Sequence, residues 1–546
     1  MNKKIISALV LSGLLLVCLL VVHFTFNIVL AKEETAVASE ASSNVSNIAA
    51  QPENPSGSNI GSYNCRYGTA GFTSQQLAWL PTLKTGWHVT FYATTPYTGE
   101  GEHVGIIRVS QDRNGSVYLP TYTTTPALTN AELGAVVSAS PGKLWLVGNE
   151  PDVADVQDDT YPSMYARIYH DVYEFIKQRD PSAQVGVAGL SMATPGRLQY
   201  LDIVWDTYLS LYGTPMPVDV WNIHVYILSE YNPTGTQGDG KLALGTDPAL
   251  AKNSPYLPLP YSQQCPLDNV YCRAEHDDVD IFIEQMVAMR QWMKDHGQRD
   301  KPLILSEFGL LYPYVEENGG CFLSDEFGNC FTPTRVNNYL YDTMQWLEAA
   351  SSLDLGYPAD DHRLVQQWLW FSLYVDAEVS GGSSNLLKDN YLSFVGGDIN
   401  GMSEVGMFYQ QQIASYELYA NLFAVEAMPT VENIQAPAST VDAEISVEFF
   451  NNGNQAITDP FTVSFYKDAN LTQLIDSVTI NPTVNGCARL GYVASVTWPS
   501  LSSGTHHFWV KLDSANVISE DVESDNVVSG VVLVDPEDIY LPFTRR

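Results

Sequence analysis

The amino-acid sequence predicts an α/β protein, a (β/α)8 TIM barrel, followed by an all-β sandwich. Three observations lead to this fold class. The 546 residues exceed what one hydrophobic core usually organises, so at least two domains are expected. From residue 62 to 426, short apolar runs alternate with amphipathic helical patterns, which is typical of a parallel sheet covered by helices. From residue 430 to 536, short β-rich runs separated by Asn, Gly, Asp and Ser are typical of an antiparallel sandwich.

The first 31 residues have the features of a targeting segment. Lys3 and Lys4 precede an apolar run from Ile5 to Leu30, and Val29-Leu30-Ala31 has the small-residue pattern of a signal-peptide cleavage site. The apolar run is also long enough to cross a bilayer as an uncleaved anchor. We therefore expect a secreted or cell-surface protein, with cleaved and membrane-tethered forms both open. Residues 32–61 are rich in Ala, Ser, Glu and Asn, which predicts a flexible stalk.

Seven apolar runs in the first domain are interpreted as buried parallel strands. They are Trp87–Ala93, Val104–Ser110, Leu144–Gly148, Val185–Leu190, Val218–Tyr226, Leu303–Ser306 and Val365–Tyr374. The eighth strand is expected between Ser116 and Thr124, at the weak run Val117-Tyr118-Leu119. Helical spacing of apolar residues predicts one helix from about Tyr165 to Ile176, and another from Phe282 to Met293 that ends near Gly297.

Charge and cysteine content narrow the classes of function. The formal net charge of −35 at pH 7 repels phosphate backbones, which argues against nucleic acid as a partner. The cysteines after the targeting segment are Cys65, Cys265, Cys272, Cys321, Cys330 and Cys487. An even number in an exported protein favours disulfides over metal ligation. Cys265 and Cys272 are close enough to close a short loop, as are Cys321 and Cys330, whereas the partners of the other two stay open. No zinc-binding motif is present, and no metal or cofactor is predicted.

Two glutamates stand at the ends of predicted buried strands. Glu150 follows Leu144–Gly148 in the sequence Asn149-Glu150-Pro151-Asp152, and Glu307 follows Leu303–Ser306. The carboxyl ends of barrel strands converge on one face, where barrel active sites lie. Retaining cleavage of a glycosidic bond needs one carboxylic acid and one nucleophilic carboxylate about 5–5.5 Å apart. The two glutamates therefore predict a glycoside hydrolase active site.

These two motifs also resemble a known family. Asn-Glu-Pro after one strand and Glu-Phe-Gly after another resemble the fourth and seventh strands of the retaining glycoside hydrolases of clan A. The similarity runs from about Trp87 to Tyr374 and is greatest for the glycosyl hydrolase catalytic core group, which includes endo-β-1,3-glucanases. It implies that Glu150 is the general acid/base, Glu307 the nucleophile and Asn149 a ligand of the sugar 2-hydroxyl. It further implies hydrolysis of a polysaccharide, a β-glucan, by double displacement, while another specificity of the same clan, that of a mannanase, xylanase or β-glycosidase, stays open.

Three more residues are expected near this pair. Val218–Tyr226 would be the sixth strand, and alternation along it places His224 and Tyr226 on one face. In the resembled clan such a residue orients the nucleophile; the alternative is a core histidine. Arg108, at what would be the second strand, is expected to lower the pKa of Glu307 and keep it ionised. Its alternative role is a structural ion pair.

Two tryptophans of the predicted eighth strand are candidates for binding sugar. Trp368 and Trp370 share one face by alternation, and an indole ring offers a flat apolar platform for a sugar ring. The alternative is that both belong to the core. Asp152 and Asp155 are expected only to favour the N-terminus of the next helix.

Two long insertions follow the sixth and seventh predicted strands. They are Leu228–Glu275 and Leu310–Thr332, and each contains one of the predicted short disulfides. Long ordered loops at the catalytic end of a barrel are usually functional. We expect them to wall an open groove, which favours cleavage inside a polysaccharide.

The second predicted domain resembles the bacterial cell-adhesion-related module called CARDB. The similarity is carried by Gly504–Asp513, Asn516–Glu520, Glu523–Asn526 and Phe449–Gly453. It implies an immunoglobulin-like spacer that attaches or extends a surface enzyme, followed by a short tail at 537–546. Its acidic residues Asp513, Glu520 and Asp525 are open to two interpretations, calcium binding or simple solvation. The alternative function for the chain is a surface adhesion or glycan-binding protein with an inactive barrel.

Overall fold

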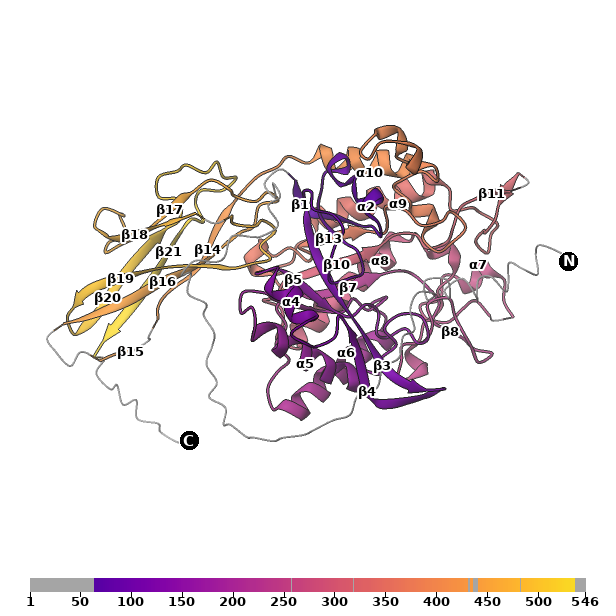
Figure 1. Ribbon diagram of the computed structural model, residues 1–546, viewed down its shortest axis with the longest axis horizontal. Coiled ribbons are helices and arrows are strands. Elements are labelled where there is room, and N and C mark those ends of the chain that lie inside the picture. Colours follow the sequence, from indigo (N-terminus) through magenta and orange to yellow (C-terminus); the bar gives the residue numbers. More distant parts are fainter. Residues whose placement is uncertain are drawn as a thin grey trace. The chain divides into compact units, whose positions relative to one another are not determined.

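The computed structural model describes residues 63–256, 258–317, 319–430, 433–435, 440–481 and 483–535 (Figure 1). The predicted targeting segment, the stalk and the C-terminal tail lie outside the described residues, and predictions about them stay predictions. Among the helices in the described ranges, none has both the length and the apolar character that crossing a bilayer requires.

Eight parallel strands form a barrel in the first domain. They are β1 (Asn64–Ala70), β2 (Thr85–Val89), β3 (Glu102–Asn114), β5 (Leu144–Val147), β6 (Gln184–Val187), β7 (Trp221–Val225), β10 (Leu303–Phe308) and β13 (Gln367–Trp370). Their order in the sheet is β6-β5-β3-β2-β1-β13-β10-β7, so each strand lies beside its neighbours in the chain. A bridge between Gly186 and Val220 joins the two ends of this order. The predicted fold class is confirmed.

All seven apolar runs contain barrel strands, but the expected eighth strand was wrong. Val117-Tyr118-Leu119 lies in β4 (Val117–Thr125), which forms an antiparallel hairpin with β3. The barrel strand that the sequence pattern did not predict is β1. It contains Asn64, Arg66 and Gly68, so it does not have the apolar pattern of a buried strand. Arg66 is fully buried because it has partners far away in the sequence, and a local pattern cannot show such partners.

Helices alternate with most of the barrel strands. The longer ones are α5 (Pro162–Lys177), α6 (Pro195–Tyr212), α8 (Val279–Asp295), α9 (Pro333–Ala349) and α10 (Glu404–Ser415). Short ones are α2 (Ser74–Leu77), α3 (Leu80–Leu83), α4 (Leu133–Ser138) and α7 (Tyr261–Gln264). Both predicted helices are confirmed as α5 and α8. The Asp278 side chain caps the start of α8, and Gly297, with φ of 68°, follows its end.

The barrel has an inner and an outer apolar layer, and alternation along each strand decides which layer a side chain enters. Leu369 packs inside the barrel with residues such as Trp87, Ile106 and Ile304. Its chain neighbours Trp368 and Trp370 belong to the larger layer that also contains the buried faces of the helices. Most of the first domain's core therefore lies between the sheet and the helices, leaving the carboxyl ends of the strands for polar side chains.

Short elements and turns occupy the connections. The insertion after β7 contains β8 (Tyr231–Asn232), β9 (Thr236–Gln237) and α7, and the insertion after β10 contains β11 (Glu316–Glu317) and β12 (Gly320–Cys321). Single 3-10 turns are η3 (Pro248–Leu250), η4 (Arg273–Glu275), η5 (Pro358–Asp360), η6 (Gly382–Ser384), η7 (Tyr391–Ser393) and η8 (Ile399–Gly401).

The second domain is a sandwich of two sheets, drawn in orange to yellow in Figure 1. One sheet has the order β14-β16-β19, formed by Leu422–Pro429, Val441–Asn451 and Tyr492–Leu501. The other has the order β15-β21-β20-β17-β18, formed by Asn433–Ile434, Val527–Val534, Gly504–Lys511, Phe461–Tyr466 and Leu474–Ile480. The predicted all-β sandwich is confirmed. The domain boundary expected between 426 and 430 falls within β14, and the division of the chain into domains stays a prediction.

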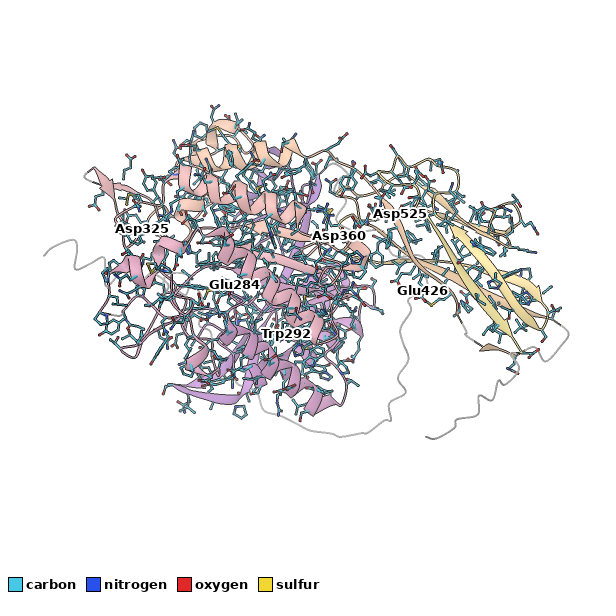
Figure 2. The ribbon with its side chains drawn as sticks, turned by 180° about the vertical axis from the view of Figure 1, so that it is seen from behind. Glu284, Trp292, Asp325, Asp360, Glu426 and Asp525 are labelled. Carbon is cyan, nitrogen blue, oxygen red and sulfur yellow. A yellow bond between two sulfur atoms is a disulfide. The ribbon has the colours of Figure 1, made fainter. Side chains whose placement is uncertain are left out.

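A disulfide and buried polar contacts join the sandwich to β1. Cys65 is bonded to Cys487, which answers the pairing left open by the sequence. The neighbouring Arg66 donates to both carboxylate oxygens of Asp360 at 3.0 Å and to the carbonyl oxygen of Asn452 at 3.1 Å. Asp360 is labelled in Figure 2. Because the bidentate pair is buried, loss of one partner would leave an uncompensated charge.

Replacing both Cys65 and Cys487 with serine is expected to lower the free energy of unfolding by about 2–4 kcal/mol. The bond spans 422 residues and therefore restricts the unfolded chain strongly. The Cys265→Ser/Cys272→Ser variant is a matched control, because its cysteines are only 7 residues apart. Calorimetric unfolding checks the order of stabilities, and equal Tm values for the two double variants would contradict it.

Candidate active site

An irregularity in β10 directs Glu307 towards the barrel axis. The register of β10 against β7 shifts between Leu305 and Glu307. As a result, the adjacent side chains Ser306 and Glu307 both reach residues of β7 and its extension. His224 Nε2 lies 3.0 Å from Ser306 Oγ, and the Tyr226 hydroxyl donates to Glu307 Oε2 at 2.9 Å. Register shifts of this kind commonly re-aim side chains beside active sites.

Glu150 is held in a strained turn after β5. Its φ is 45°, in the left-handed region that non-glycine residues rarely adopt, and the preceding Gly148 has φ of 94°. The backbone N–H of Glu150 donates to the carbonyl oxygen of Gly189 at 3.0 Å, and that of Asn149 donates to Asp158 Oδ2 at 2.7 Å. Such strain costs roughly 1–3 kcal/mol and persists where the surroundings impose it, most often at functional sites.

A buried ion-pair network stabilises the turn that contains Glu150. Arg197 on α6 pairs with Asp152 at 2.8 Å and also with Glu230, and all three side chains are almost completely buried. Ser191 Oγ donates to Asp152 at 3.0 Å. Asp152 therefore links the Glu150 turn to α6 and to the first insertion, which corrects the expectation that it only favours a helix start. Asp155 likewise pairs with an arginine, Arg113 of β3.

The two predicted catalytic glutamates face each other across His224. His224 Nδ1 lies 3.1 Å from Glu150 Oε1, and Nε2 lies 3.7 Å from Glu307 Oε1. One ligand-type atom of each of the three side chains lies within 4.8 Å of the other two. The absence of a side chain at Gly189 makes room for this arrangement, since a Cβ there would lie 2.2 Å from the imidazole. Tyr226 joins on the same face, as alternation predicted.

Burial and neighbouring charges shift the pKa values of Glu307 and His224. Burial and the charge of Glu150 raise the pKa of Glu307 to about 7, against the effects of His224, Tyr226 and Arg108. Burial lowers the pKa of His224, but the two glutamates outweigh it and the net direction is upward. Glu307 therefore keeps its proton to a higher pH than an ordinary carboxyl group does.

Arg108 has a different main partner from the one expected. It lies on β3, the third barrel strand and not the second, because the sequence concealed β1. Its Nε donates to Asp158 Oδ1 at 2.6 Å, and its Nη2 donates to Gln157 at 3.2 Å. Arg108 does lower the pKa of Glu307, as expected, but burial and the charge of Glu150 outweigh it and the net shift is upward. The structural ion pair, the alternative role, describes Arg108 better.

The expectation of a tryptophan platform was wrong. Trp368 and Trp370 are both 0% exposed and belong to the outer layer of the barrel, so neither offers a ring face to a sugar. Trp370 also donates from its indole nitrogen to the carbonyl oxygen of Ser384 at 2.9 Å. Asn149, by contrast, lies beside Glu150, and its Oδ1 has no hydrogen-bond partner among the described residues.

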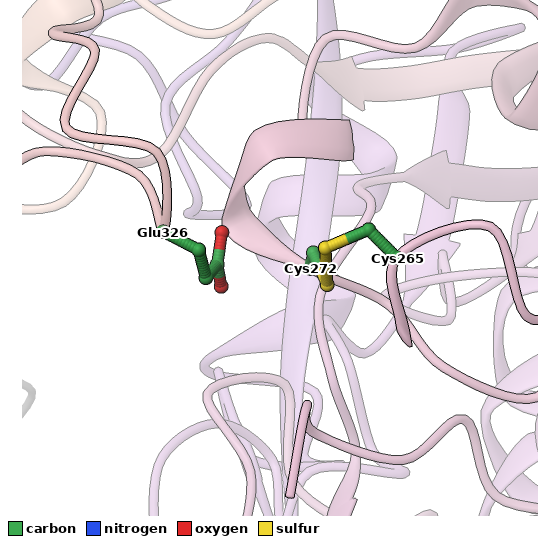
Figure 3. Close-up of side chains that lie close together, drawn as sticks. All are labelled: Cys265, Cys272 and Glu326. Atoms are coloured by element: carbon green, nitrogen blue, oxygen red, sulfur yellow. A yellow bond between two sulfur atoms is a disulfide. The ribbon is translucent and has the colours of Figure 1, made fainter. Parts of the chain in front are cut away.

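The two insertions are attached to each other beside the active-site end of the barrel. Cys265 is bonded to Cys272 in the first, and Glu326 of the second accepts hydrogen bonds at 2.9 Å from the backbone N–H groups of Arg273 and Ala274 (Figure 3). The other predicted disulfide, Cys321–Cys330, is also present. Asp325, labelled in Figure 2, pairs with Arg335 at the start of α9.

Further contacts between the insertions surround His276. Its Nε2 accepts a hydrogen bond from the backbone N–H of Leu311 at 2.7 Å, and its Nδ1 lies 2.8 Å from the carbonyl oxygen of Ile227. The hydroxyl of Tyr312 donates to Asp239 across the same boundary at 2.9 Å. These contacts therefore hold the loops after β7 and β10 together as one connected segment of the surface. Whether it borders an open groove stays a prediction.

Within the described ranges, two groups of side chains bring potential metal ligands together. In the group of Cys265, Cys272 and Glu326, both sulfur atoms are consumed by the disulfide, so no thiolate is available (Figure 3). The second group is Glu150, His224 and Glu307 itself. Here the imidazole already contacts both carboxylates, and the arrangement suits acid/base and nucleophilic chemistry.

The described residues thus define a (β/α)8 barrel with a carboxylate pair after its fourth strand and on its seventh, joined to a β-sandwich. Residues 428–530 match the CARDB family, and the sandwich is a CARDB domain. No protein in a search of curated sequences matches the chain.

Several solved structures resemble parts of the chain at low identity. A GH128 (subgroup III) curdlan-specific exo-β-1,3-glucanase from Blastomyces gilchristii, in complex with glucose, is 16% identical over 63% of this chain and 97% of that chain, with a TM-score of 0.35. A monomeric β-xylosidase from Caulobacter crescentus is 11% identical over 81% and 96%, with a TM-score of 0.36. The CARDB domain of a Pyrococcus furiosus protein, in complex with di-metal ions, is 17% identical over 22% and 96%, with a TM-score of 0.18.

Proposed function

We propose that the chain is an extracellular retaining glycoside hydrolase that cleaves a polysaccharide, a β-glucan, by double displacement. The observation that carries the proposal is the approach of Glu150 and Glu307 to within 4.8 Å through one oxygen of each. Retaining enzymes place their carboxyl groups about 5–5.5 Å apart, whereas inverting enzymes need about 6.5–9.5 Å to admit a water molecule. The short separation therefore supports retention.

In the first step, a Glu307 carboxylate oxygen attacks the anomeric carbon while the bond from that carbon to the glycosidic oxygen breaks. Glu150 gives its proton to the departing oxygen, and a glycosyl ester forms on Glu307. The Tyr226 hydroxyl, 2.9 Å from Glu307 Oε2, orients the nucleophile and leaves its other oxygen for the attack.

In the second step, Glu150 takes a proton from water, and the resulting hydroxide equivalent attacks the same carbon. The ester bond breaks and Glu307 recovers its carboxylate, so the configuration at the anomeric carbon is restored. His224 lies between the two side chains and compensates the negative charge that moves between them. The Oδ1 atom of Asn149, which has no partner among the described residues, accepts a hydrogen bond from the sugar 2-hydroxyl.

The disulfides and the CARDB domain support an extracellular location. Disulfides persist in oxidising compartments, and those of the two insertions stiffen loops beside the active site. The third disulfide fixes the CARDB domain to the first barrel strand. We therefore assign the domain to anchoring or extending the enzyme at a surface, and the chemistry to the barrel.

Proton NMR during hydrolysis of a soluble β-1,3-glucan tests the mechanism. The first reducing end to appear should be the β-anomer, with the α-anomer following at the rate of mutarotation, because two displacements restore the configuration. A parallel panel of glucan, xylan and mannan, read by reducing-end release, tests the substrate. An α-anomer as first product would refute double displacement, and hydrolysis of xylan or mannan alone would refute the assignment to β-glucan.

A further inference from the structure

Three phenylalanine rings meet at the mouth of the barrel. Phe72 follows β1, Phe91 follows β2 and Phe371 follows β13. Phe72 and Phe91 are stacked, with ring centroids 5.4 Å apart and an angle of 17° between planes. Phe371 meets their edges, with centroids 6.1 Å from Phe91 and 6.5 Å from Phe72. Strands that are distant in sequence thus contribute to one aromatic cluster.

This cluster lies next to the strand that carries the proposed nucleophile. The backbone N–H of Phe371 donates to the carbonyl oxygen of Phe308 at 2.9 Å, and Phe308 directly follows Glu307. Phe91 and Phe371 pack on the apolar residues inside the barrel. Phe72 is 37% exposed, and Tyr92, beside Phe91, is 57% exposed. The cluster therefore covers the inner layer and still presents apolar surface to solvent.

The backbone around the rings is fixed. Phe91 has φ of 61°, a conformation that a bulky side chain adopts only when its surroundings impose it. The backbone N–H of Phe72 donates to Gln76 Oε1 at 2.7 Å, and Gln76 Nε2 donates to the carbonyl oxygen of Tyr374 at 3.2 Å. Gln76 thereby ties the loop after β1 to the segment after β13. The exposed ring of Phe72, held in this way against the partly buried Phe91, is organised before any ligand arrives.

We propose that Phe72, supported from behind by the stacked ring of Phe91, forms a binding platform for a pyranose ring of the glycan, next to the sugar unit whose glycosidic bond is cleaved. The inference rests on the proposed function and deepens it by assigning a residue class to substrate recognition. Aromatic faces attract flat apolar surfaces. A β-linked glucose unit carries its hydroxyls equatorially and offers two such faces, whereas the axial 2-hydroxyl of mannose interrupts one. The platform therefore selects gluco-configured chains.

Steady-state kinetics of the Phe72→Ala and Phe72→Trp variants test the platform. For a long β-1,3-glucan, Phe72→Ala should raise KM about tenfold, because one stacked ring is lost, and Phe72→Trp should restore it. For an aryl β-glucoside, which has a single sugar unit and therefore lacks the neighbouring sugar that the platform would bind, the loss in kcat/KM should be smaller. Tyr341→Ala is the matched control, since Tyr341 is an exposed aromatic residue on α9. An unchanged KM for the glucan in Phe72→Ala would overturn the proposal.

Calorimetric binding of β-1,3-gluco- and β-1,4-manno-oligosaccharides separates this inference from the proposed function. If the wild-type protein hydrolyses neither substrate, the hydrolase assignment fails, yet Phe72→Ala should still weaken binding of the gluco-oligosaccharide about tenfold. Equal Kd values for the wild type and Phe72→Ala would refute the platform. Tighter binding of the manno-oligosaccharide by the wild type would refute the preference for gluco-configured chains.

Discussion

The Glu307→Gln variant is expected to lose turnover of the glucan by about 10⁴-fold or more in kcat, because removal of a covalent nucleophile typically costs about 10⁴–10⁶-fold. The amide has nearly the shape of the carboxylate and can still accept the hydrogen bond from Tyr226. It cannot form the glycosyl ester. Binding of the glucan should therefore persist, because the aromatic and polar groups around the site are unchanged. Initial rates from reducing-end release, together with Kd from calorimetry, check both parts.

A matched control separates loss of chemistry from loss of fold. Glu284→Gln makes the same change on the exposed surface of α8, where Glu284 is labelled in Figure 2. This variant should keep the wild-type kcat and Tm. If Glu307→Gln keeps the wild-type rate, Glu307 is not the nucleophile. If the wild-type protein binds glucan without hydrolysing it, the alternative of a glycan-binding surface protein is supported instead.

Patterns local in sequence predicted most of the architecture. A parallel strand that is buried on both faces usually consists of apolar residues. The sequence therefore predicted β5 and β10, together with the glutamates at their ends. The strand β1 was not visible, because burial of Arg66 depends on Asp360 and on a carbonyl of the sandwich. A polar strand of this kind is recognisable only when its distant partners are known.

The sequence predicted the site residues whose side-chain direction follows from alternation along one strand. It did not predict those whose position depends on other parts of the fold. Alternation correctly predicted that His224 and Tyr226 share one face of their strand. It also predicted that Trp368 and Trp370 share a face, but it did not predict whether that face lies inside or outside the barrel. Leu369 takes the inner position, so the tryptophans enter the outer layer. The phenylalanine cluster was missed because its rings come from loops after three separate strands, and no spacing within one segment brings them together.

The Glu150→Ala variant should lose glucan hydrolysis by about 10²–10⁴-fold, the range that general acid catalysis contributes. The loss should be much smaller for a dinitrophenyl β-glucoside, because that leaving group departs as a stable anion and needs no proton. The comparison of kcat/KM for the two substrates checks this. Equal losses would mean that Glu150 positions the substrate and does not act as an acid.

The pH dependence of the same variant gives the sharper test. The nucleophile must be ionised to attack, and burial together with the charge of Glu150 raises the pKa of Glu307 to about 7. Activity on the glucan should therefore rise as the pH increases through about 7, where Glu307 loses its proton. Removal of Glu150 removes a charge that raises the pKa of Glu307, so for the dinitrophenyl β-glucoside this rise should occur at lower pH in Glu150→Ala than in the wild type. A rise that stays at the wild-type pH in Glu150→Ala would mean that Glu150 does not control the ionisation of Glu307, and His224, which contacts both glutamates, would be the first residue to examine.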